Sequence, residues 1–251
     1  MEPRFLTPAH SSLIAPDIYA DKSGLVLQWL LLTGIEKDAF SLREAAAESM
    51  VSLGLVQRVF EYLVREGFLK AVGVRTAKKF ELQKPKKLLT AWAEHYSLVS
   101  KCKLWNYRTA LGGREEVLNI LKRSSLWKQA CLALHSAAEF HGCKNTNLQT
   151  LELYILNPEL RVQIEQKLEL QLQERGYEIL LIRPYYKAML SNRKGTKLLT
   201  SEKLKVPGIH LFYAPALLTF LDLYNFPLRG REQAEFMAQR IPELKRIFKK
   251  D

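Results

Sequence analysis

Gln57 and Arg58 stand next to each other on the polar side of a predicted helix. A glutamine amide can make two hydrogen bonds to adenine, and an arginine guanidinium can make two to guanine. Both contacts are made in the major groove of B-form DNA, which is wide enough to admit an α-helix. The pair therefore predicts a helix that reads bases.

Cationic and hydroxyl side chains surround this pair in the sequence. Arg75, Lys78 and Lys79 form a basic turn suited to phosphate, and such contacts give affinity that is independent of base sequence and falls with salt. Ser41 and Ser52 start helices, where a hydroxyl group can bond a phosphate oxygen. The predicted DNA-binding residues are Ser41, Arg43, Ser52, Gln57, Arg58, Arg75, Lys78 and Lys79.

Local signals mark the helices that carry these residues. Ser41 with Glu44 three residues later is a capping box, which starts a helix. After a tight connection, Ser52 is a favourable N-cap for a second helix, and Gly67 stops it. Apolar residues recur at helical spacing on the core-facing side of this second helix: Leu55, Val56, Val59, Phe60 and Leu63.

A strand-like pattern on each side of the basic turn completes the motif. Residues 68–72 and 79–82 alternate like strands, so the segment 41–82 predicts a winged helix-turn-helix. A small helical domain used for protein contacts would show the same pattern. The basic turn favours DNA over that alternative.

The composition restricts the class of protein. The 251 residues carry a formal net charge of +12, which favours a polyanionic partner, and a hydrophobic content of 47% is enough for real cores. No apolar run reaches membrane-spanning length, and the N-terminus lacks the regions of a signal peptide. The three cysteines are too widely spaced for a disulfide framework, so we expect a cytoplasmic protein without membrane contact.

A polar, basic segment, 83–87, contains a proline and predicts the boundary between two domains, 1–84 and 85–251. The first has a proline-containing arm up to Asp21 and a helix over 21–33. Strands alternate with helices in the second, so we expect an α+β protein with a C-terminal mixed α/β domain. The expected C-terminal helices are 88–98, 115–122, 136–140, 157–174, 216–224, 231–239 and 242–250; the expected strands are 103–108, 130–134, 151–155, 177–183 and 209–213, with a basic loop over 183–205.

Two groups of residues suggest other chemistry. Cys131, His135, His141 and Cys143 are types that bind zinc, but their spacings match no compact zinc module. Buried cysteines and a hydrogen-bonded histidine explain them better, so we expect no metal and no cofactor.

Nucleotidyl transfer uses a Gly-Ser turn before a strand with two carboxylates one residue apart, because these carboxylates hold the metal ions. Here Leu134, His135 and Ser136 precede a helix, and a later strand holds Glu152 and Tyr154. His135 replaces the glycine and Tyr154 the second carboxylate. One carboxylate cannot clamp two metal ions, so the layout suggests a degenerate nucleotidyltransferase-like fold without activity.

The motifs occur in a recognisable order. The winged helix is followed by a helix with Leu88, Leu89, Trp92 and Ala93, a strand with Tyr107-Arg108, and a small-residue turn at 136–138. The segment Tyr213 to Leu223, Tyr-Ala-Pro-Ala-Leu-Leu-Thr-Phe-Leu-Asp-Leu, is the most specific part, and Arg231-Glu232-Gln233-Ala234-Glu235 follows it. This order resembles the AbiEi-type antitoxins of type IV toxin–antitoxin systems, which are bacterial transcriptional regulators.

The resemblance implies a cytoplasmic, non-enzymatic autorepressor that binds repeats in double-stranded DNA upstream of its own operon. It also implies a nucleotidyltransferase-like toxin that is counteracted without a stable complex. A homodimer is one of the oligomeric states that the sequence allows. The chain departs from the family pattern at His135, where glycine is usual, and in its basic loop at Arg193-Lys194.

Within the 213–223 segment, Tyr213, Phe220 and Leu223 are expected in the core. Asp222 on the same helix could pair with an arginine such as Arg229 or Arg231. Two other function classes stay open: a nucleotide- or RNA-handling enzyme with Glu152 as a metal ligand, and a protein-interaction module whose basic surface only keeps it soluble.

Overall fold

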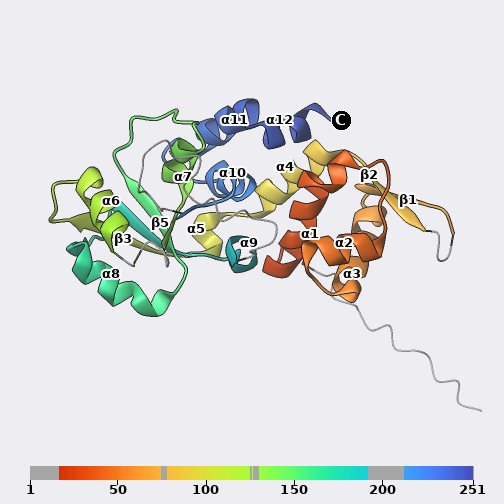
Figure 1. Ribbon diagram of the computed structural model, residues 1–251. Helices are drawn as coiled ribbons and strands as arrows, with labels where there is room; N and C mark the ends of the chain where they lie inside the picture. Colours follow the sequence, from red (N-terminus) through yellow and green to blue (C-terminus); the bar gives the residue numbers. More distant parts are fainter. Residues whose placement is uncertain (1–16, 75–77, 125, 127–129, 192–211, 251) are drawn as a thin grey trace, which may run out of the picture.

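The computed structural model describes residues 17–74, 78–124, 126, 130–191 and 212–250. The molecule is elongated, with three N-terminal helices and a β-hairpin at one end and a larger β-sheet at the other (Figure 1). The predicted arm before residue 17, Arg75 and the basic loop from residue 192 lie outside the described residues. The expectation of an α+β protein is confirmed at the level of mixed helices and strands.

The N-terminal helices are α1 (Asp21–Leu32), α2 (Leu42–Ser49) and α3 (Leu53–Arg65), with a short 3-10 helix, η1 (Gly34–Glu36), after α1. The Ser41 hydroxyl accepts a hydrogen bond of 3.1 Å from the amide of Glu44, and the Glu44 carboxylate returns to the amide of Ser41. The Ser52 hydroxyl accepts from the amide of Leu55 at 3.3 Å. Both predicted helix starts are therefore confirmed.

The hairpin consists of β1 (Leu69–Val72) and β2 (Lys79–Leu82), which pair antiparallel. Phe40, between η1 and α2, also pairs with Phe80 of β2 through two backbone hydrogen bonds of 2.8 and 2.9 Å. The rings of Phe40, Phe60 and Phe80 meet edge to face, with centroids 5.8 and 4.9 Å apart. This aromatic row fixes the hairpin against α3, because edge-to-face contacts between aromatic rings bury large apolar areas in a defined geometry.

The junction after the hairpin is short. Only two residues separate β2 from helix α4 (Pro85–His95), and the second of them, Lys84, has a left-handed backbone with φ 47°. Proline at the first helical position costs no hydrogen bond there. The predicted helix 88–98 is wrong in extent, since the chain leaves the helix at Tyr96 and starts α5 (Leu98–Lys101) two residues later.

A mixed six-stranded sheet forms the other end of the molecule. Its strands are β3 (Lys103–Thr109), β4 (Ala130–Leu132), β5 (Leu151–Ile155), β6 (Leu170–Leu172), β7 (Ile179–Arg183) and β8 (Phe212–Tyr213), in the order β6-β3-β7-β5-β4-β8. The pairs β5–β7 and β4–β8 are parallel, and the others are antiparallel. Central strands β5 and β7 are buried along almost their whole length, as expected for strands in the middle of a sheet covered on both faces.

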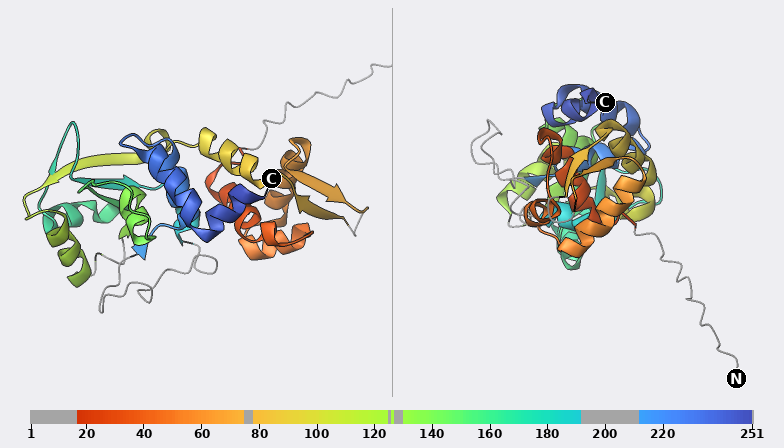
Figure 2. Two further views of the ribbon diagram at one scale, coloured as in Figure 1. Left: turned by 90° about the horizontal axis from the view of Figure 1, so that it is seen from above. Right: turned by 90° about the vertical axis from the view of Figure 1, so that its right-hand side faces the viewer.

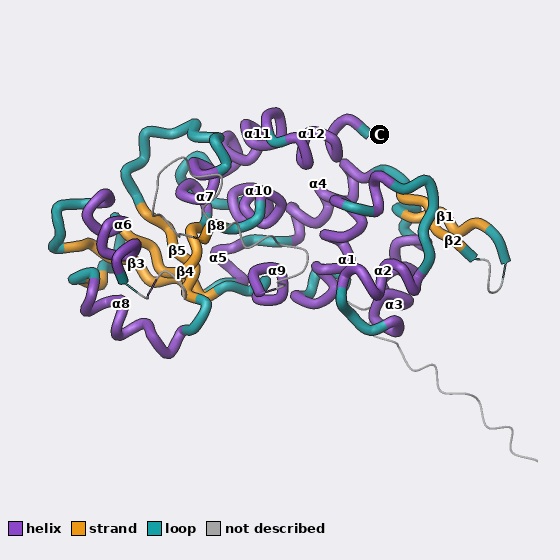
Figure 3. The backbone as a smooth tube through the Cα atoms, in the orientation of Figure 1, coloured by secondary structure: helices purple, strands orange, loops and turns teal. Residues whose placement is uncertain are grey.

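The remaining helices lie beside this sheet or next to the N-terminal half of the molecule (Figure 3). They are α6 (Arg114–Arg123), α7 (Leu134–Phe140), η4 (Pro158–Leu160), α8 (Arg161–Lys167), α9 (Lys187–Ser191), α10 (Ala216–Tyr224), α11 (Gly230–Arg240) and α12 (Pro242–Lys249). Helix α10 packs against α4, α7 and α11, and eight of its nine residues are buried. It is therefore the central helix of the C-terminal half.

Several predictions about this region are wrong: the basic loop expected over 183–205 contains helix α9, and the turn expected at 136–138 lies inside helix α7. The helix expected over 157–174 ends at Lys167, and the chain then forms β6 against β3. The residues of β6 are good helix formers, so the pairing with β3 has overridden local propensity. The strand expected over 130–134 ends at Leu132, because Leu134 already begins α7.

Hydrogen bonds join the N-terminal helices to the C-terminal half of the molecule. The Arg246 guanidinium of α12 donates to the carbonyl oxygen of Leu32 at 2.8 Å. The Tyr186 hydroxyl donates to the carbonyl oxygen of Tyr19 at 2.8 Å and accepts from the Trp92 indole at 2.7 Å. The predicted domain boundary near residue 84 thus lies beside a packed interface, and it stays a prediction.

In the parts of the chain that the structure describes, no helix combines the length and the hydrophobicity needed to span a bilayer.

Candidate nucleic-acid interface

Helix α3 has one buried face and one exposed face. Val56, Val59, Phe60 and Leu63 are fully or almost fully buried, at 0 to 1% exposure. The opposite face is exposed and polar: Gln57, Arg58, Glu61 and Arg65. The helical period of 3.6 residues separates the two sets, so the helix is held by one side and presents the other to solvent.

The polar side chains of this face differ in their availability. The Gln57 amide donates to the Glu61 carboxylate at 2.9 Å, one helical turn away. Arg65 pairs with Glu66 at 3.1 Å and lies over the Tyr62 ring. Arg58 forms no ion pair with any residue in the described part of the chain, so of the two arginines on this face it is the one left to bind an external group.

Helix α2 contributes a second cation to the same end. Arg43 is exposed, whereas the neighbouring acids are already occupied. Lys37 pairs with Glu44 and, at 3.2 Å, with Glu48, and the Trp29 indole donates to Glu48 at 2.7 Å. Lys37 also lowers the pKa of the Glu44 carboxyl. The acids of α2 therefore carry their own counter-charge, which leaves the Arg43 charge for an outside anion.

The hairpin adds exposed lysines. Lys78 and Lys79 lie at the start of β2, and the Lys78 ammonium lies 5.4 Å from the centre of the Phe80 ring. Lys70 on β1 is partly neutralised by Glu81, 3.8 Å away. The right-hand view in Figure 2 has α3 and the hairpin together at one end of the molecule.

The structure thus brings together most of the predicted residues. Exposed side chains at this end are Arg43, Ser52, Gln57, Arg58, Lys78 and Lys79, and Ser41 is half-buried in its capping box. Arg75 lies outside the described residues. Sequence reasoning gave no role to Met50 and Leu53, whose exposure depends on how α2 and α3 meet and carries no local signal.

The second predicted motif, Ser136 with Glu152, forms a closed buried network. Glu152 has 0% exposure, and its carboxylate accepts from the amide and hydroxyl of Ser136 at 2.9 and 2.6 Å. The Thr150 hydroxyl donates to the other carboxylate oxygen at 2.5 Å. Because its oxygens already have internal donors, Glu152 caps α7 and fixes it to β5.

The histidines of the zinc hypothesis bond the backbone. His135 donates from Nε2 to the carbonyl oxygen of Leu228 at 3.0 Å, and His141 to that of Ala214 at 2.9 Å. Burial lowers the pKa of both imidazoles. Within the described ranges, no three His, Cys, Asp or Glu side chains come together in a way that would hold a metal ion.

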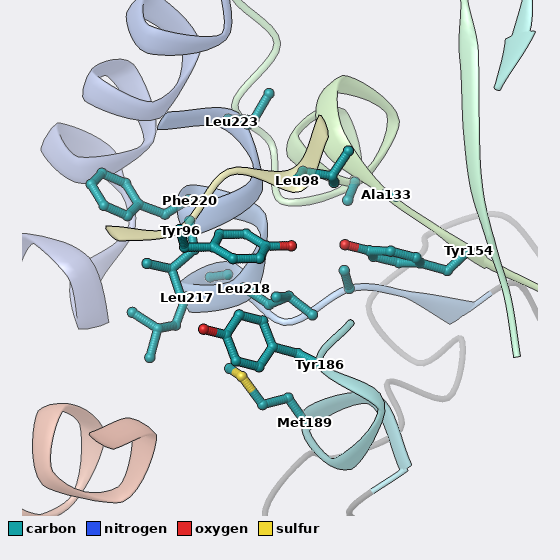
Figure 4. Packing of buried hydrophobic residues seen from close by; sticks show 14 of the residues in the cluster. Tyr96, Leu98, Ala133, Tyr154, Tyr186, Met189, Leu217, Leu218, Phe220 and Leu223 are labelled. Atoms are coloured by element: carbon teal, nitrogen blue, oxygen red, sulfur yellow. The ribbon is translucent and has the colours of Figure 1, made fainter. Parts of the chain in front are cut away.

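Asp222 is buried among tyrosines, and the prediction that it pairs with an arginine is wrong. Its two carboxylate oxygens accept from the hydroxyls of Tyr96 at 3.0 Å and Tyr154 at 2.7 Å. These two hydroxyls point toward each other in Figure 4. Arg229 instead pairs with Glu232 at 2.6 Å, and Arg231 lies over the Tyr224 ring.

Of the three residues of this segment expected in the core, two are buried and one is half-buried. Phe220 and Leu223 are buried as expected, at 1% and 0% exposure. Tyr213 is only half-buried and stacks on Phe140, so its assignment to the core is wrong.

A family model described as "Transcriptional regulator, AbiEi antitoxin, Type IV TA system" matches residues 81–242. The match begins in β2 and covers the sheet together with helices α4 to α11, whereas α1 to α3 lie outside it. No curated protein and no solved structure matches the chain. The candidate base-reading helix, α3, thus lies outside the matched region, together with α2 and β1.

Proposed function

Because the chain belongs to the AbiEi antitoxin family of transcriptional regulators of type IV toxin–antitoxin systems, we propose that it binds specific DNA sequences and represses its own operon. Residues 1–84 are the proposed DNA-binding domain, a winged helix-turn-helix, and residues 85–251 the antitoxin domain. The proposed location is the cytoplasm, where operator DNA is accessible.

One observation supports this proposal above the others: α3 exposes Gln57 and Arg58 on a face whose opposite side is anchored in the core. A helix held in this way can enter the major groove as a rigid body. The α2–α3 turn and the hairpin beside α3 are the further parts that a winged helix needs.

The charge distribution supports phosphate contacts on either side of that helix. Arg43 would lie on one flank, and Lys78 and Lys79 on the other. The net charge of +12 gives a long-range attraction between the protein and polyanionic DNA. Base contacts by Gln57 and Arg58 would then choose the site.

The proposed second partner is a nucleotidyltransferase-like toxin, counteracted without a stable complex. A degenerate nucleotidyltransferase-like fold in the C-terminal half would fit the position of Glu152 on β5, hydrogen-bonded to Ser136 at the start of α7. Since Glu152 is engaged by Ser136 and Thr150, its proposed role is structural, and the proposed function is regulatory and not catalytic. A homodimer would match a repeated operator.

Titration of the full chain against its own promoter fragment tests the proposal. The affinity for the promoter fragment should fall steeply from the lower to the higher salt concentration. An unrelated fragment of equal length should bind more weakly at both concentrations. Equal binding to both fragments would leave only a nonspecific basic surface. No salt-dependent binding, together with capture of a stoichiometric protein partner, would favour a protein-interaction module instead.

A further inference from the structure

Met50 and Leu53 are exposed apolar side chains beside the polar face of α3, and Val72 and Val74 of the hairpin are further exposed apolar residues at this end. Met50 has 54% of its surface exposed and Leu53 has 45%. Both belong to the α2–α3 junction: Met50 follows α2, and Leu53 is the first residue of α3. The contact of exposed apolar groups with water is unfavourable, so a molecule that covers these groups gains binding free energy.

The backbone conformation of Met50 also indicates that its side chain has a role other than folding. Met50 has φ 57°, a left-handed conformation that a residue with a side chain adopts at a cost and that glycine adopts freely. Glycine would adopt this backbone conformation at lower cost than the large apolar residue that is present. Its side chain is mostly exposed, so packing does not explain it.

The surroundings indicate what covers this patch. Leu53 lies one helical turn before Gln57 on α3, and Arg43 and Arg58 flank the junction without ion pairs to the residues that the structure describes. A Cβ atom at Gly54 would meet nothing within 4 Å, so the first turn of α3 is open to a close neighbour. A covering molecule must therefore be apolar locally and anionic around its edges.

Duplex DNA meets both requirements in the major groove, where the 5-methyl group of thymine is apolar and phosphates line both sides. We infer that Met50 and Leu53 contact thymine methyl groups in the operator, next to the bases read by Gln57 and Arg58. This inference rests on the proposed function, and it adds the base class that the first turn of α3 selects. Each half-site should contain thymine beside the base pairs contacted by the polar residues.

Replacement of thymine by deoxyuridine tests the inference, because it deletes only the methyl group and leaves the base pairing intact. The best-binding duplex is first selected from random-sequence DNA with the full chain. Each thymine is then replaced singly, and the dissociation constant is measured by fluorescence anisotropy. At one or two positions, deoxyuridine should weaken binding of the wild type about fourfold, the effect of one buried methyl-sized group.

Variants connect this penalty to the two side chains. In Leu53→Ala, the deoxyuridine penalty should disappear at one or more of the thymine positions. The same should hold for Met50→Gly, because glycine readily adopts the φ of this position. Leu172→Ala is the matched control, since Leu172 is 65% exposed on β6 in the large sheet. It should keep the full penalty.

Two results would overturn the inference: no position at which deoxyuridine weakens the wild type, or a penalty that persists in both Leu53→Ala and Met50→Gly. Failure of the proposed function looks different, because the selection would then yield no preferred duplex, and this inference would fall with it.

Discussion

The hydroxyl group of Tyr154 donates a hydrogen bond of 2.7 Å to the carboxylate of Asp222, a side chain with 0% exposure. Tyr96, at the end of α4, donates to the other oxygen at 3.0 Å. The carboxylate therefore joins α10 to β5 and to the helix that follows the hairpin. Burial raises the pKa of Asp222 to about 7, although both tyrosine hydrogen bonds oppose this shift.

We predict that Asp222 makes the protein less stable as the pH rises from 4 toward 7. The unfolded chain ionises this carboxyl near pH 3.8, whereas the folded protein keeps it protonated until about pH 7. Its stabilising contribution is therefore complete below pH 3.8 and is lost progressively up to pH 7. Between pH 5 and pH 7 the loss should be about 2 kcal/mol, from roughly 1.4 kcal/mol per pH unit.

Urea unfolding of the wild type and of Asp222→Asn at pH 5 and pH 7 measures this loss. The amide does not titrate, so the free energy of unfolding of the variant relative to the wild type should improve by about 2 kcal/mol at the higher pH. The same difference between the two proteins at both pH values would mean that Asp222 ionises normally in the fold.

Tyr186→Phe should cost about 1–3 kcal/mol of unfolding free energy, because it removes the acceptor of a buried donor. The Trp92 indole, at 0% exposure, donates to the Tyr186 hydroxyl at 2.7 Å, and phenylalanine would leave it without a partner. Tyr185→Phe is the matched control, since the neighbouring ring is half-buried. Chemical denaturation of both variants should separate them, and equal stability would mean that the Trp92–Tyr186 bond contributes nothing.

Sequence reasoning succeeded where the signals were local. The capping box at Ser41, the cap at Ser52 and the apolar period of α3 depend on residues three or four positions apart, and the structure has all of them. The strand β2 was predicted within its bounds because Phe80 alternates with charged neighbours. The exposure of Gln57 and Arg58 followed from the same helical period.

The failures involve partners that are distant in the sequence. The helix-forming residues Leu170 to Leu172 became a strand because β3, more than 60 residues earlier, offered an open edge. Asp222 took its hydrogen bonds from Tyr96 and Tyr154 instead of a nearby arginine, a choice made by the packing of α10 on the sheet. No local pattern contains this information.

Ser52 offers a way to separate folding from DNA binding. Ser52→Ala should destabilise the protein by about 1 kcal/mol, because the amide of Leu55 loses its cap. Ser52→Asp restores a capping oxygen and adds a negative charge at the helix N-terminus, so its melting temperature should match or exceed that of the wild type. The same charge repels phosphate, so Ser52→Asp should bind the promoter fragment more weakly than the wild type does. Unchanged affinity in Ser52→Asp would mean that the start of α3 stays away from DNA.

Arg58 and Lys79 should differ in how their loss affects DNA binding. Arg58→Ala should cost about 1–3 kcal/mol of binding free energy and relax the preference at one base pair, as expected for a bidentate guanine contact. Lys79→Ala should weaken all duplexes to a similar extent and reduce the slope of log affinity against log salt by about one. Arg65→Ala is the control on the same helix, since Arg65 already pairs with Glu66 and lies over Tyr62. Anisotropy titrations at several salt concentrations, with single base-pair changes in the duplex, distinguish these effects, and equal behaviour of Arg58→Ala and Arg65→Ala would argue against α3 as the base-reading helix.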